Sequence, residues 1–485
     1  MPSQAKKITF DTSALFAAKI ISMILGIIRL KYIATYLGVG SFGIYTFALY
    51  FVAMFAIFFD VGLTQIITRD IAADRSRTQS YVFNSLLLKS LLIAATTILI
   101  VFATVLSRFD ELTNWAVAFS IFITGVNSLT LVFTSVFQAY RKMQLVSIIT
   151  VATDLSTSIV VIALLIHGYG LFGLLVGSAI ASLLVFLSAL LLCRRTCGTI
   201  LSRPVYGLWT HLLKEGYPVA LGSLGIVLYL YVTSALLKYL QGNEEAGYYN
   251  AALKIIMILT VVPTSFTLVV YPFFAELFNN SRDKLQSVLE ISVRYMFVIS
   301  IPLSVGTILV AKKLILTLYT PAFLPAVLPL QILIVSSLFS YANYVLYAFF
   351  PAVNLQRFGM FITIPTGLAV AIVNYLLVPS MGILVPSFSL AAVEIILFIS
   401  AYFYLLHLKM KLNLYKMFVK PLLSCLPMTL SIFLLLRFSI FIQVGVAIAT
   451  YGIAFYIFKG IFREDRVILE RILPLRIKNL ILKNT

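Results

Sequence analysis

The sequence predicts an all-α polytopic membrane protein of about 14 transmembrane helices, and three observations predict this class. The 485 residues are 61% hydrophobic and 11% charged, with a mean hydropathy of +1.05, whereas soluble domains carry roughly 25% charged residues. Apolar runs of about 20 residues, enough to cross a bilayer core, recur along the chain. These runs are uniformly apolar, whereas the strands of a membrane barrel alternate apolar and polar positions.

Each predicted helix corresponds to one of these runs. In order along the chain, the runs cover residues 12–36, 43–68, 83–107, 113–138, 146–166, 171–193, 211–239, 248–275, 288–310, 324–349, 357–378, 382–406, 416–437 and 439–459.

The loops predict the orientation of the chain. With the N-terminus inside, the inner loops and tails hold about 25 Lys and Arg residues, whereas the outer loops hold only Arg108, Lys312 and Lys313. Basic residues accumulate on the cytoplasmic side of membrane proteins. We therefore expect a multi-pass protein of the cell (plasma) membrane with both termini in the cytoplasm. The net charge of +19 then reflects topology, and we expect no nucleic-acid partner.

Two internal repeats predict a division into lobes. YLGVGSFGIYTFAL (36–49) resembles YLQGNEEAGYYNAAL (239–253), and HGYGLFGLLVGSAIASLL (167–184) resembles PSMGILVPSFSLAAVEII (379–396). An even number of helices per copy predicts parallel repeats, related by an axis along the membrane normal. The predicted domains are an N-lobe of six helices (1–198), a C-lobe of six helices (199–410), an added helix pair (411–460) and a basic cytoplasmic tail (461–485).

Prolines are distributed unevenly between these lobes. None occurs between Pro2 and Pro204, whereas the second lobe has several within or near its helices, among them Pro218, Pro263, Pro272, Pro302 and Pro365. Proline removes a backbone donor and bends a helix, so we expect the kinked helices in the second lobe.

Enzyme and metal motifs are missing from the sequence. It has no phosphate-binding glycine loop, no HExxH motif and no acidic pair in a long outer loop. Cys193, Cys197 and Cys425 form no disulfide or zinc framework, so we interpret them as structural. The three histidines, His167, His211 and His407, stand at helix ends as interfacial residues. We expect a non-enzyme with no catalytic residue, no metal and no cofactor.

Ionisable residues inside the predicted helices are the candidate functional residues. Placing such a residue in a membrane helix costs about 2.5–3.5 kcal/mol on insertion scales, so its presence suggests a function. The cations, as candidate ligands of a phosphate or pyrophosphate head, are Lys19, Arg29, Lys89, Lys254 and Arg294. The anions, as candidates for charge pairing or ion coupling, are Asp60 and Glu394.

Three of these charges fall at one depth in the first lobe. Lys19, Asp60 and Lys89 lie roughly 9–14 Å from the cytoplasmic ends of their helices at 1.5 Å per residue, so the sequence predicts a cluster with one surplus positive charge. Arg29 would add a bidentate fork. The alternative is that the lysines extend to the inner headgroups and Asp60 pairs with one of them to hold the lobe together.

Three candidates belong to the second lobe. Lys254 near the outer end of its helix is a candidate to take over the phosphate as the cavity opens outward, and Arg294 near an inner end has headgroup contact as its alternative. Glu394 lies near the middle of its helix, where proton coupling and a structural hydrogen bond are the two interpretations. Other polar residues, expected mostly to form interhelical hydrogen bonds, are Asn127, Gln138, Asp154, Asn250, Gln331, Asn343 and Asn374.

Residues 35–72 carry a family resemblance. The matching features are a Leu-Gly turn, Phe42-Gly43-Ile44-Tyr45, Asp60-Val61-Gly62-Leu63 and Arg69-Asp70-Ile71-Ala72. Further similar stretches are AGYYNAALKIIMIL (246–259), LYTPAFLPAVLPLQIL (318–333) and residues 355–396 with Asn374 and Gly382. The chain thereby resembles the polysaccharide biosynthesis transporter family, the O-antigen and repeat-unit flippase type of the multidrug/oligosaccharidyl-lipid/polysaccharide exporter superfamily.

The resemblance implies two lobes around a central cavity that opens alternately to each side, a MATE-like fold. It implies a flippase that moves a polyprenyl phosphate- or pyrophosphate-linked oligosaccharide from the inner to the outer leaflet for cell-surface polysaccharide synthesis. The implied partners are that lipid-linked oligosaccharide, membrane lipids, and glycosyltransferases or a polymerase of the same pathway. The alternative is a cation-coupled small-molecule antiporter of the same superfamily, in which anionic cavity residues should dominate. A scaffold without transport would leave the intramembrane charges unexplained.

Overall fold

The computed structural model describes residues 2–198 and 200–460, with side chains outside 1–14, 279 and 356. These residues form helices joined by short turns, and no strand occurs among them. The predicted basic tail, 461–485, lies outside the described residues. The all-α polytopic class is confirmed.

Within the described part of the chain, 13 helical segments are long and apolar enough to cross a membrane. The protein is therefore a multi-pass membrane protein. The segment Leu15–Phe55, 41 residues long, is twice the length that a bilayer needs and contains two helices joined at a kink at Gly38, where the first two predicted runs meet.

Glycines interrupt the first helices. Helix α1 (Pro2–Phe55) contains Gly38 at φ 69° and ψ 177°, a conformation in which a side chain would clash. Helices α2 (Ile57–Asp60) and α3 (Leu63–Ala73) are separated by two left-handed residues, Val61 at φ 45° and Gly62 at φ 74°. The predicted helix 43–68 is thus broken inside the Asp60-Val61-Gly62-Leu63 motif.

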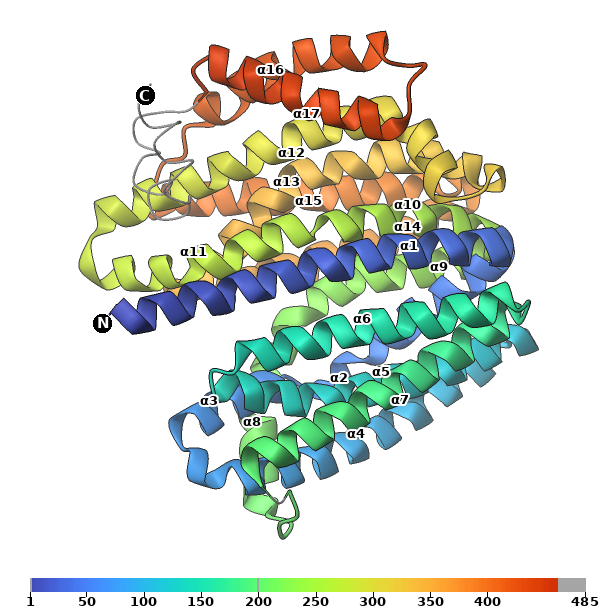
Figure 1. Ribbon diagram of the computed structural model, residues 1–485, viewed down its shortest axis with the longest axis vertical. Coiled ribbons are helices and arrows are strands. Elements are labelled where there is room, and N and C mark those ends of the chain that lie inside the picture. The colour runs from blue at the N-terminus through green and yellow to red at the C-terminus, as the bar shows by residue number, and fades with distance from the viewer. Residues whose placement is uncertain (1, 199, 461–485) are drawn as a thin grey trace. The chain divides into compact units, whose positions relative to one another are not determined.

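The remaining helices of the first half follow in order. They are α4 (Thr78–Ser107), α5 (Glu111–Ala139), α6 (Met143–Ile166), α7 (Gly170–Cys197), α8 (Tyr206–Ile226) and α9 (Thr233–Gln241), with a 3₁₀ turn at Arg75–Arg77 and a π-helical turn at Val227–Val232. Helix α1 packs along α6, which in turn packs on α7, and α4, α5 and α7 lie beside them (Figure 1).

The second half contains the helices from α10 onward. They are α10 (Asn243–Leu259), α11 (Val261–Asn280), α12 (Arg282–Leu318), α13 (Val327–Ala352), α14 (Gln356–Met381), α15 (Leu384–His407), α16 (Leu414–Leu434) and α17 (Ile440–Ile457), with a 3₁₀ turn at Pro321–Ala326. Helices α16 and α17, which cover the predicted helix pair at 411–460, pack against each other (Figure 1).

The chain divides into two compact units. The first comprises Met1–Ala251, Leu318–Ala322 and Thr363–Pro386, and the second comprises Ala252–Thr317, Phe323–Ile362 and Ser387–Thr485. The first unit therefore includes segments of both predicted lobes, and the division at residue 198 stays a prediction. The core of the second unit is aromatic: the ring of Phe297 packs against those of Phe398 and Phe418, with centroids 5.5 and 4.4 Å apart.

The two copies of the first repeat meet inside the first unit. A Cβ on Gly43 would lie 1.9 Å from the Asn243 carbonyl oxygen, and a Cβ on Gly247 would lie 2.6 Å from the Val39 carbonyl oxygen. Glycine is required at both positions because the backbones approach so closely. Gly43 and Gly247 are equivalent positions of the repeat, and so are Val39 and Asn243, so the two contacts are related to each other as in a two-fold symmetric interface.

Candidate functional site

Lys89 on α4 is bound tightly inside the first unit. Its side chain is 0% exposed, and its ammonium lies 2.5 Å from Asp60 Oδ1. It also donates to Thr64 Oγ1 and to the Ser128 backbone oxygen, both at 3.0 Å. The three donors of a lysine ammonium are therefore all engaged.

The same carboxylate spans the break between α2 and α3. Asp60 is the last residue of α2, and Asp60 Oδ1 accepts from the backbone and the hydroxyl of Thr64 at 3.3 and 2.5 Å. Of the three residues predicted to cluster, Lys19, Asp60 and Lys89, the structure gives a direct contact between Asp60 and Lys89. Its geometry favours the alternative that this pair holds the first-half helices together.

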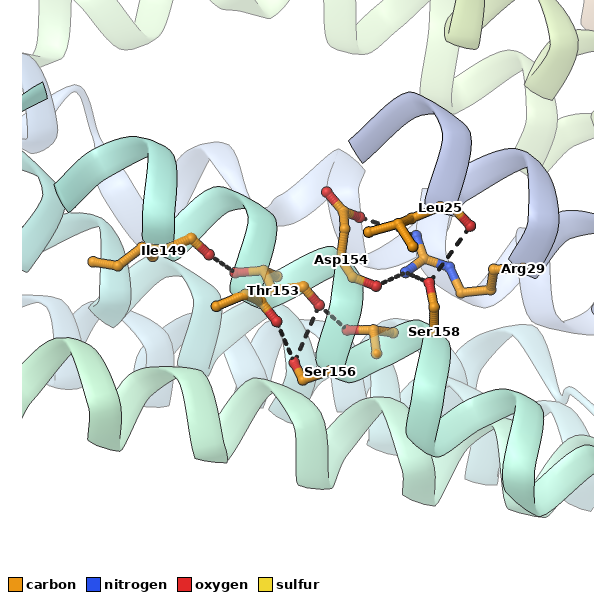
Figure 2. A network of polar contacts seen from close by, with 9 residues as sticks. Leu25, Arg29, Ile149, Thr153, Asp154, Ser156 and Ser158 are labelled. Atoms are coloured by element: carbon orange, nitrogen blue, oxygen red, sulfur yellow. Dashed lines mark hydrogen bonds and ion pairs between the residues drawn. The ribbon is translucent and has the colours of Figure 1, made fainter. Parts of the chain in front are cut away.

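Arg29 on α1 has a looser partner. Arg29 Nη2 donates to Asp154 Oδ1 on α6 at 3.3 Å, and Nη1 donates to the Asp154 backbone oxygen and Ser158 Oγ, both at 3.4 Å. Figure 2 shows the guanidinium beside Asp154 and Ser158, whose hydroxyl donates to the Leu25 backbone oxygen at 3.5 Å. Charge-assisted hydrogen bonds are normally about 2.7–2.9 Å long, so this ion pair is loose.

Asp154 lies in the middle of its helix. It stands 11 residues from Met143 and 12 from Ile166 at the ends of α6, about 17 Å from each end at 1.5 Å per residue. The side chains of Arg29 and Asp154 are 21% and 26% exposed. The structure therefore presents a partly accessible guanidinium within the apolar span.

The other four predicted residues lie on four different helices, α1, α10, α12 and α15. Lys19 is half-buried on α1 and Lys254 is half-buried on α10, whereas Arg294 on α12 is 2% exposed. Glu394 on α15 is half-buried, and Asn343 Nδ2 on α13 donates to its carboxylate at 2.7 Å and to its backbone oxygen at 2.9 Å. Lys254, Arg294 and Glu394 belong to the second unit.

Lys238 on α9 is a buried cation that the sequence reasoning missed. Its ammonium donates to Thr113 Oγ1 at 2.5 Å, lies 4.0 Å from Asp110 Oδ1, and sits 4.3 and 5.5 Å from the ring centroids of Phe47 and Phe109. These contacts tie α9 to α1 and to the start of α5. Lys238 stands at the edge of the apolar run 211–239, and the aromatic rings that enclose it come from distant positions, so the sequence gives no signal for the cluster.

A second missed cluster joins α3 to α8. The Asp70 carboxylate accepts from Arg69 Nε at 2.8 Å and Tyr81 OH at 3.1 Å, and lies 2.9 Å from His211 Nε2. Arg69 Nη1 also reaches Glu215 at 3.1 Å. Burial opposes ionisation of Asp70, but the hydrogen bonds from Arg69, His211 and Tyr81 outweigh it and hold the pKa of Asp70 below its usual 3.8.

His211 therefore has a specific partner, where the sequence suggested only an interfacial residue.

At the opposite end of the first unit, Asp110 caps α5. Burial again raises its pKa, but hydrogen bonds from Thr113 and the charge of Lys238 outweigh that effect and lower it. In the described part of the chain, no group of three His, Cys, Asp or Glu side chains gathers as a metal site would require.

Long apolar helices with a charged pair among them place the chain in the class of multi-pass membrane proteins. Three solved structures share the fold. The lipid II flippase MurJ in an inward closed conformation matches with TM-score 0.74 and 19% identity over 92% of this chain and 98% of that chain. An inward-facing multidrug resistance MATE transporter of the MOP superfamily matches with TM-score 0.64 and 14% identity over 82% of this chain and 99% of that chain. A MOP superfamily transporter from Pyrococcus furiosus matches with TM-score 0.59 and 15% identity over 82% of this chain and 96% of that chain.

The sequence places the chain more closely. The polysaccharide biosynthesis protein family matches residues 8–278, more than half of the chain, and the protein belongs to that family. No curated protein sequence matches the chain. Family and fold are those of transporters and flippases, and the predicted family resemblance is confirmed.

Proposed function

We propose that this protein is a flippase that moves a polyprenyl phosphate- or pyrophosphate-linked oligosaccharide from the inner to the outer leaflet by alternating access. Membership of the polysaccharide biosynthesis protein family supports a role in cell-surface glycan assembly. The fold likeness to the lipid II flippase supports the same reading, because that protein carries a lipid-linked substrate.

The Arg29–Asp154 pair carries the proposal. A guanidinium binds phosphate through two parallel hydrogen bonds, and its attraction is stronger in a poorly hydrated, apolar surrounding than in water. Arg29 is partly accessible, its contacts to Asp154 and Ser158 are long, and it lies in the apolar segment Leu15–Phe55. Lys19, on the same helix, is a second candidate ligand for the headgroup.

The proposed roles of the other charges follow from their placement. Lys254 in the second unit is proposed to receive the phosphate in the outward-open state, and Arg294, near an inner helix end, to be a further ligand of the phosphate head. Lys89, fully engaged with Asp60, is proposed to keep α2, α3 and α4 aligned. The glycan would occupy the water-filled side of the cavity, while the lipid tail stays in the bilayer.

We also propose that both termini are cytoplasmic and that the protein resides in the plasma membrane, since the basic residues concentrate in one set of loops. Glycosyltransferases or a polymerase of the same pathway are the proposed protein partners.

A cation-coupled small-molecule exporter is the second candidate function. The fold likeness to a multidrug MATE transporter and the half-buried carboxylate of Glu394 favour it. Glu394 is held by Asn343 and is the proposed coupling residue in that case.

Reconstituted vesicles distinguish the two functions. Two probes are compared at fixed protein density: a fluorescent polyprenyl-pyrophosphate disaccharide, whose exposure is read by a membrane-impermeant quencher, and a fluorescent organic cation under a proton or sodium gradient. We expect leaflet exchange of the first probe above protein-free vesicles and no gradient-driven uptake of the second. The reverse result would replace the flippase proposal by the exporter, and Glu394→Gln would then abolish uptake.

A further inference from the structure

The two intramembrane ion pairs of the first unit differ in how firmly they hold their cation. Lys89 is 0% exposed, lies 2.5 Å from its carboxylate and has two further acceptors at 3.0 Å. Arg29 is 21% exposed, and its three contacts measure 3.3–3.4 Å. The first pair has the geometry of a fixed structural bond, and the second has that of a bond that is easily exchanged.

The chemistry of Asp154 resembles that of the proposed substrate head. A carboxylate and a phosphate both offer anionic oxygens to the same guanidinium fork. With Asp154 in place, Arg29 is neutralised inside the span, which removes the cost of an uncompensated charge there. A phosphate arriving at Arg29 supplies the same compensation to the cation, and the displaced Asp154 carboxylate, which is 26% exposed, is hydrated in its place.

We propose that Asp154 is a resident counter-ion which the phosphate of the substrate displaces from Arg29, so that Asp154 sets the affinity for the headgroup and speeds its release. This rests on the proposed function. Because the ion-paired state is not competent to bind, the apparent affinity equals the intrinsic affinity multiplied by the fraction of time that Arg29 is free of Asp154. The same competition returns Arg29 to Asp154 when the headgroup leaves.

The arrangement of α6 supports exchange over rigid packing. The hydroxyls next to Asp154 are already satisfied within the helix: Thr153 donates to Ile149 O at 2.8 Å and Ser156 donates to Ala152 O at 2.6 Å. Figure 2 shows the Thr153 and Ser156 side chains bonded along the helix, whereas the Asp154 side chain is directed towards Arg29. Within the described residues, Arg29 is the cation paired with that carboxylate, so loss of this pair leaves the rest of the α6 hydrogen-bond pattern unchanged.

The test measures binding and transport of the fluorescent polyprenyl-pyrophosphate disaccharide by purified full-length protein. For Asp154→Asn we expect the apparent dissociation constant to fall by up to about fivefold, the range that loss of a partly exposed ion pair allows. We expect the maximal flipping rate to fall as well, because release slows. For Arg29→Gln we expect weaker binding than wild type, and the double variant Arg29→Gln/Asp154→Asn should bind better than Arg29→Gln, since no carboxylate then repels the phosphate.

A second variant keeps the test decisive if Asp154→Asn does not fold. Asp154→Glu retains the charge and extends it by one methylene towards Arg29, so we expect weaker binding of the probe than wild type. Thermal unfolding of each variant reports whether the fold is intact.

Two results would overturn the inference, and they differ from failure of the proposed function. Wild-type protein that flips the probe, together with a folded Asp154→Asn variant of unchanged or weaker affinity, shows that the pair is only structural. Unchanged affinity in Asp154→Glu has the same meaning. Wild-type protein that neither binds nor flips the probe rejects the flippase itself, and the counter-ion role with it.

Discussion

At the scale of single residues, the cost of burying a charge determines what each intramembrane ion pair does. Lys89 has no exposed surface and engages all three of its donors, so removing its carboxylate leaves a charge that cannot reach water. Arg29 and Asp154 keep about a fifth and a quarter of their surface exposed, so either can be rehydrated when the other is lost.

Asp60→Asn is therefore expected to destabilise the protein strongly. Asp60 is itself 28% exposed, but the Lys89 cation that it would leave behind is fully buried. Stranding a buried charge costs about 3–5 kcal/mol, whereas a pair with both partners partly exposed contributes about 0–1 kcal/mol. The measurement is the midpoint of thermal unfolding of purified protein, with Asp154→Asn as the matched control at the looser pair. We expect a large decrease for Asp60→Asn and a small one for the control.

The double variant Asp60→Asn/Lys89→Met completes this comparison. Because the buried ammonium is removed too, we expect it to regain much of the lost stability. Equal unfolding midpoints for Asp60→Asn and Asp154→Asn would contradict the assignment of the tight pair as structural.

The contribution of the Asp70 carboxylate, in the cluster that joins α3 to α8, to the stability of the fold depends on pH. Hydrogen bonds lower its folded-state pKa below the usual 3.8, so it stabilises the fold at pH above about 4 and loses that effect as the pH falls through the lowered value. We expect the difference in unfolding midpoint between wild type and Asp70→Asn to be constant near neutral pH and to shrink below pH 4. A difference that stays constant down to pH 3 would show that the carboxylate charge contributes nothing.

At the scale of helices, the two copies of the first repeat contact each other at equivalent residues. Asn250 Nδ2 donates to Thr46 Oγ1 at 3.0 Å, and these residues are 204 positions apart, which is the offset of the first repeat. Equivalent residues touch each other only near a two-fold axis. Beside them, Gly43 and Gly247 allow the backbones of α1 and α10 to touch.

Gly43→Ala is expected to separate the two copies. The new methyl carbon would lie 1.9 Å from the Asn243 carbonyl oxygen, whereas a Cβ at Gly40 on the same helix meets nothing within 4 Å. Spin labels at the exposed positions Tyr36 and Tyr239, in a cysteine-free background, report the distance between the copies.

We expect a longer label distance for Gly43→Ala and no change for Gly40→Ala, whose alanine favours the helix by about 1 kcal/mol. Identical distance distributions for the two variants would mean that the close contact does not control this end of the molecule.

At the scale of the whole molecule, the length and uniform apolarity of the runs predict the class correctly, because only helices and closed barrels span a bilayer and barrel strands alternate apolar and polar positions. The interruptions were harder to predict. Proline points to kinks in the second half, but the first half is also interrupted, at Gly38 and at Val61–Gly62, where backbone conformation and close packing decide. Neither signal appears in hydropathy.

The candidate site was predictable in part. Asp60, Lys89 and Arg29 stand out as charges in apolar helices, and the depth estimate brings the first two together as the structure does. Asp154 was placed only among polar residues, and Lys238 lies at the edge of an apolar run, so their partners could be identified only from the packing of α1, α6 and α9. Pairing across 125 positions has no local signal.

The central claim is that the protein carries a lipid-linked anionic glycan across the membrane and that Arg29 holds the anionic group. The most direct measurement is the rate of leaflet exchange in reconstituted vesicles for two probes with the same disaccharide, one linked through pyrophosphate and one through an uncharged ether. The account predicts fast exchange of the pyrophosphate probe, slow exchange of the neutral probe, and loss of the difference in Arg29→Gln. Equal exchange of both probes by the wild-type protein, or no exchange above protein-free vesicles, would contradict it.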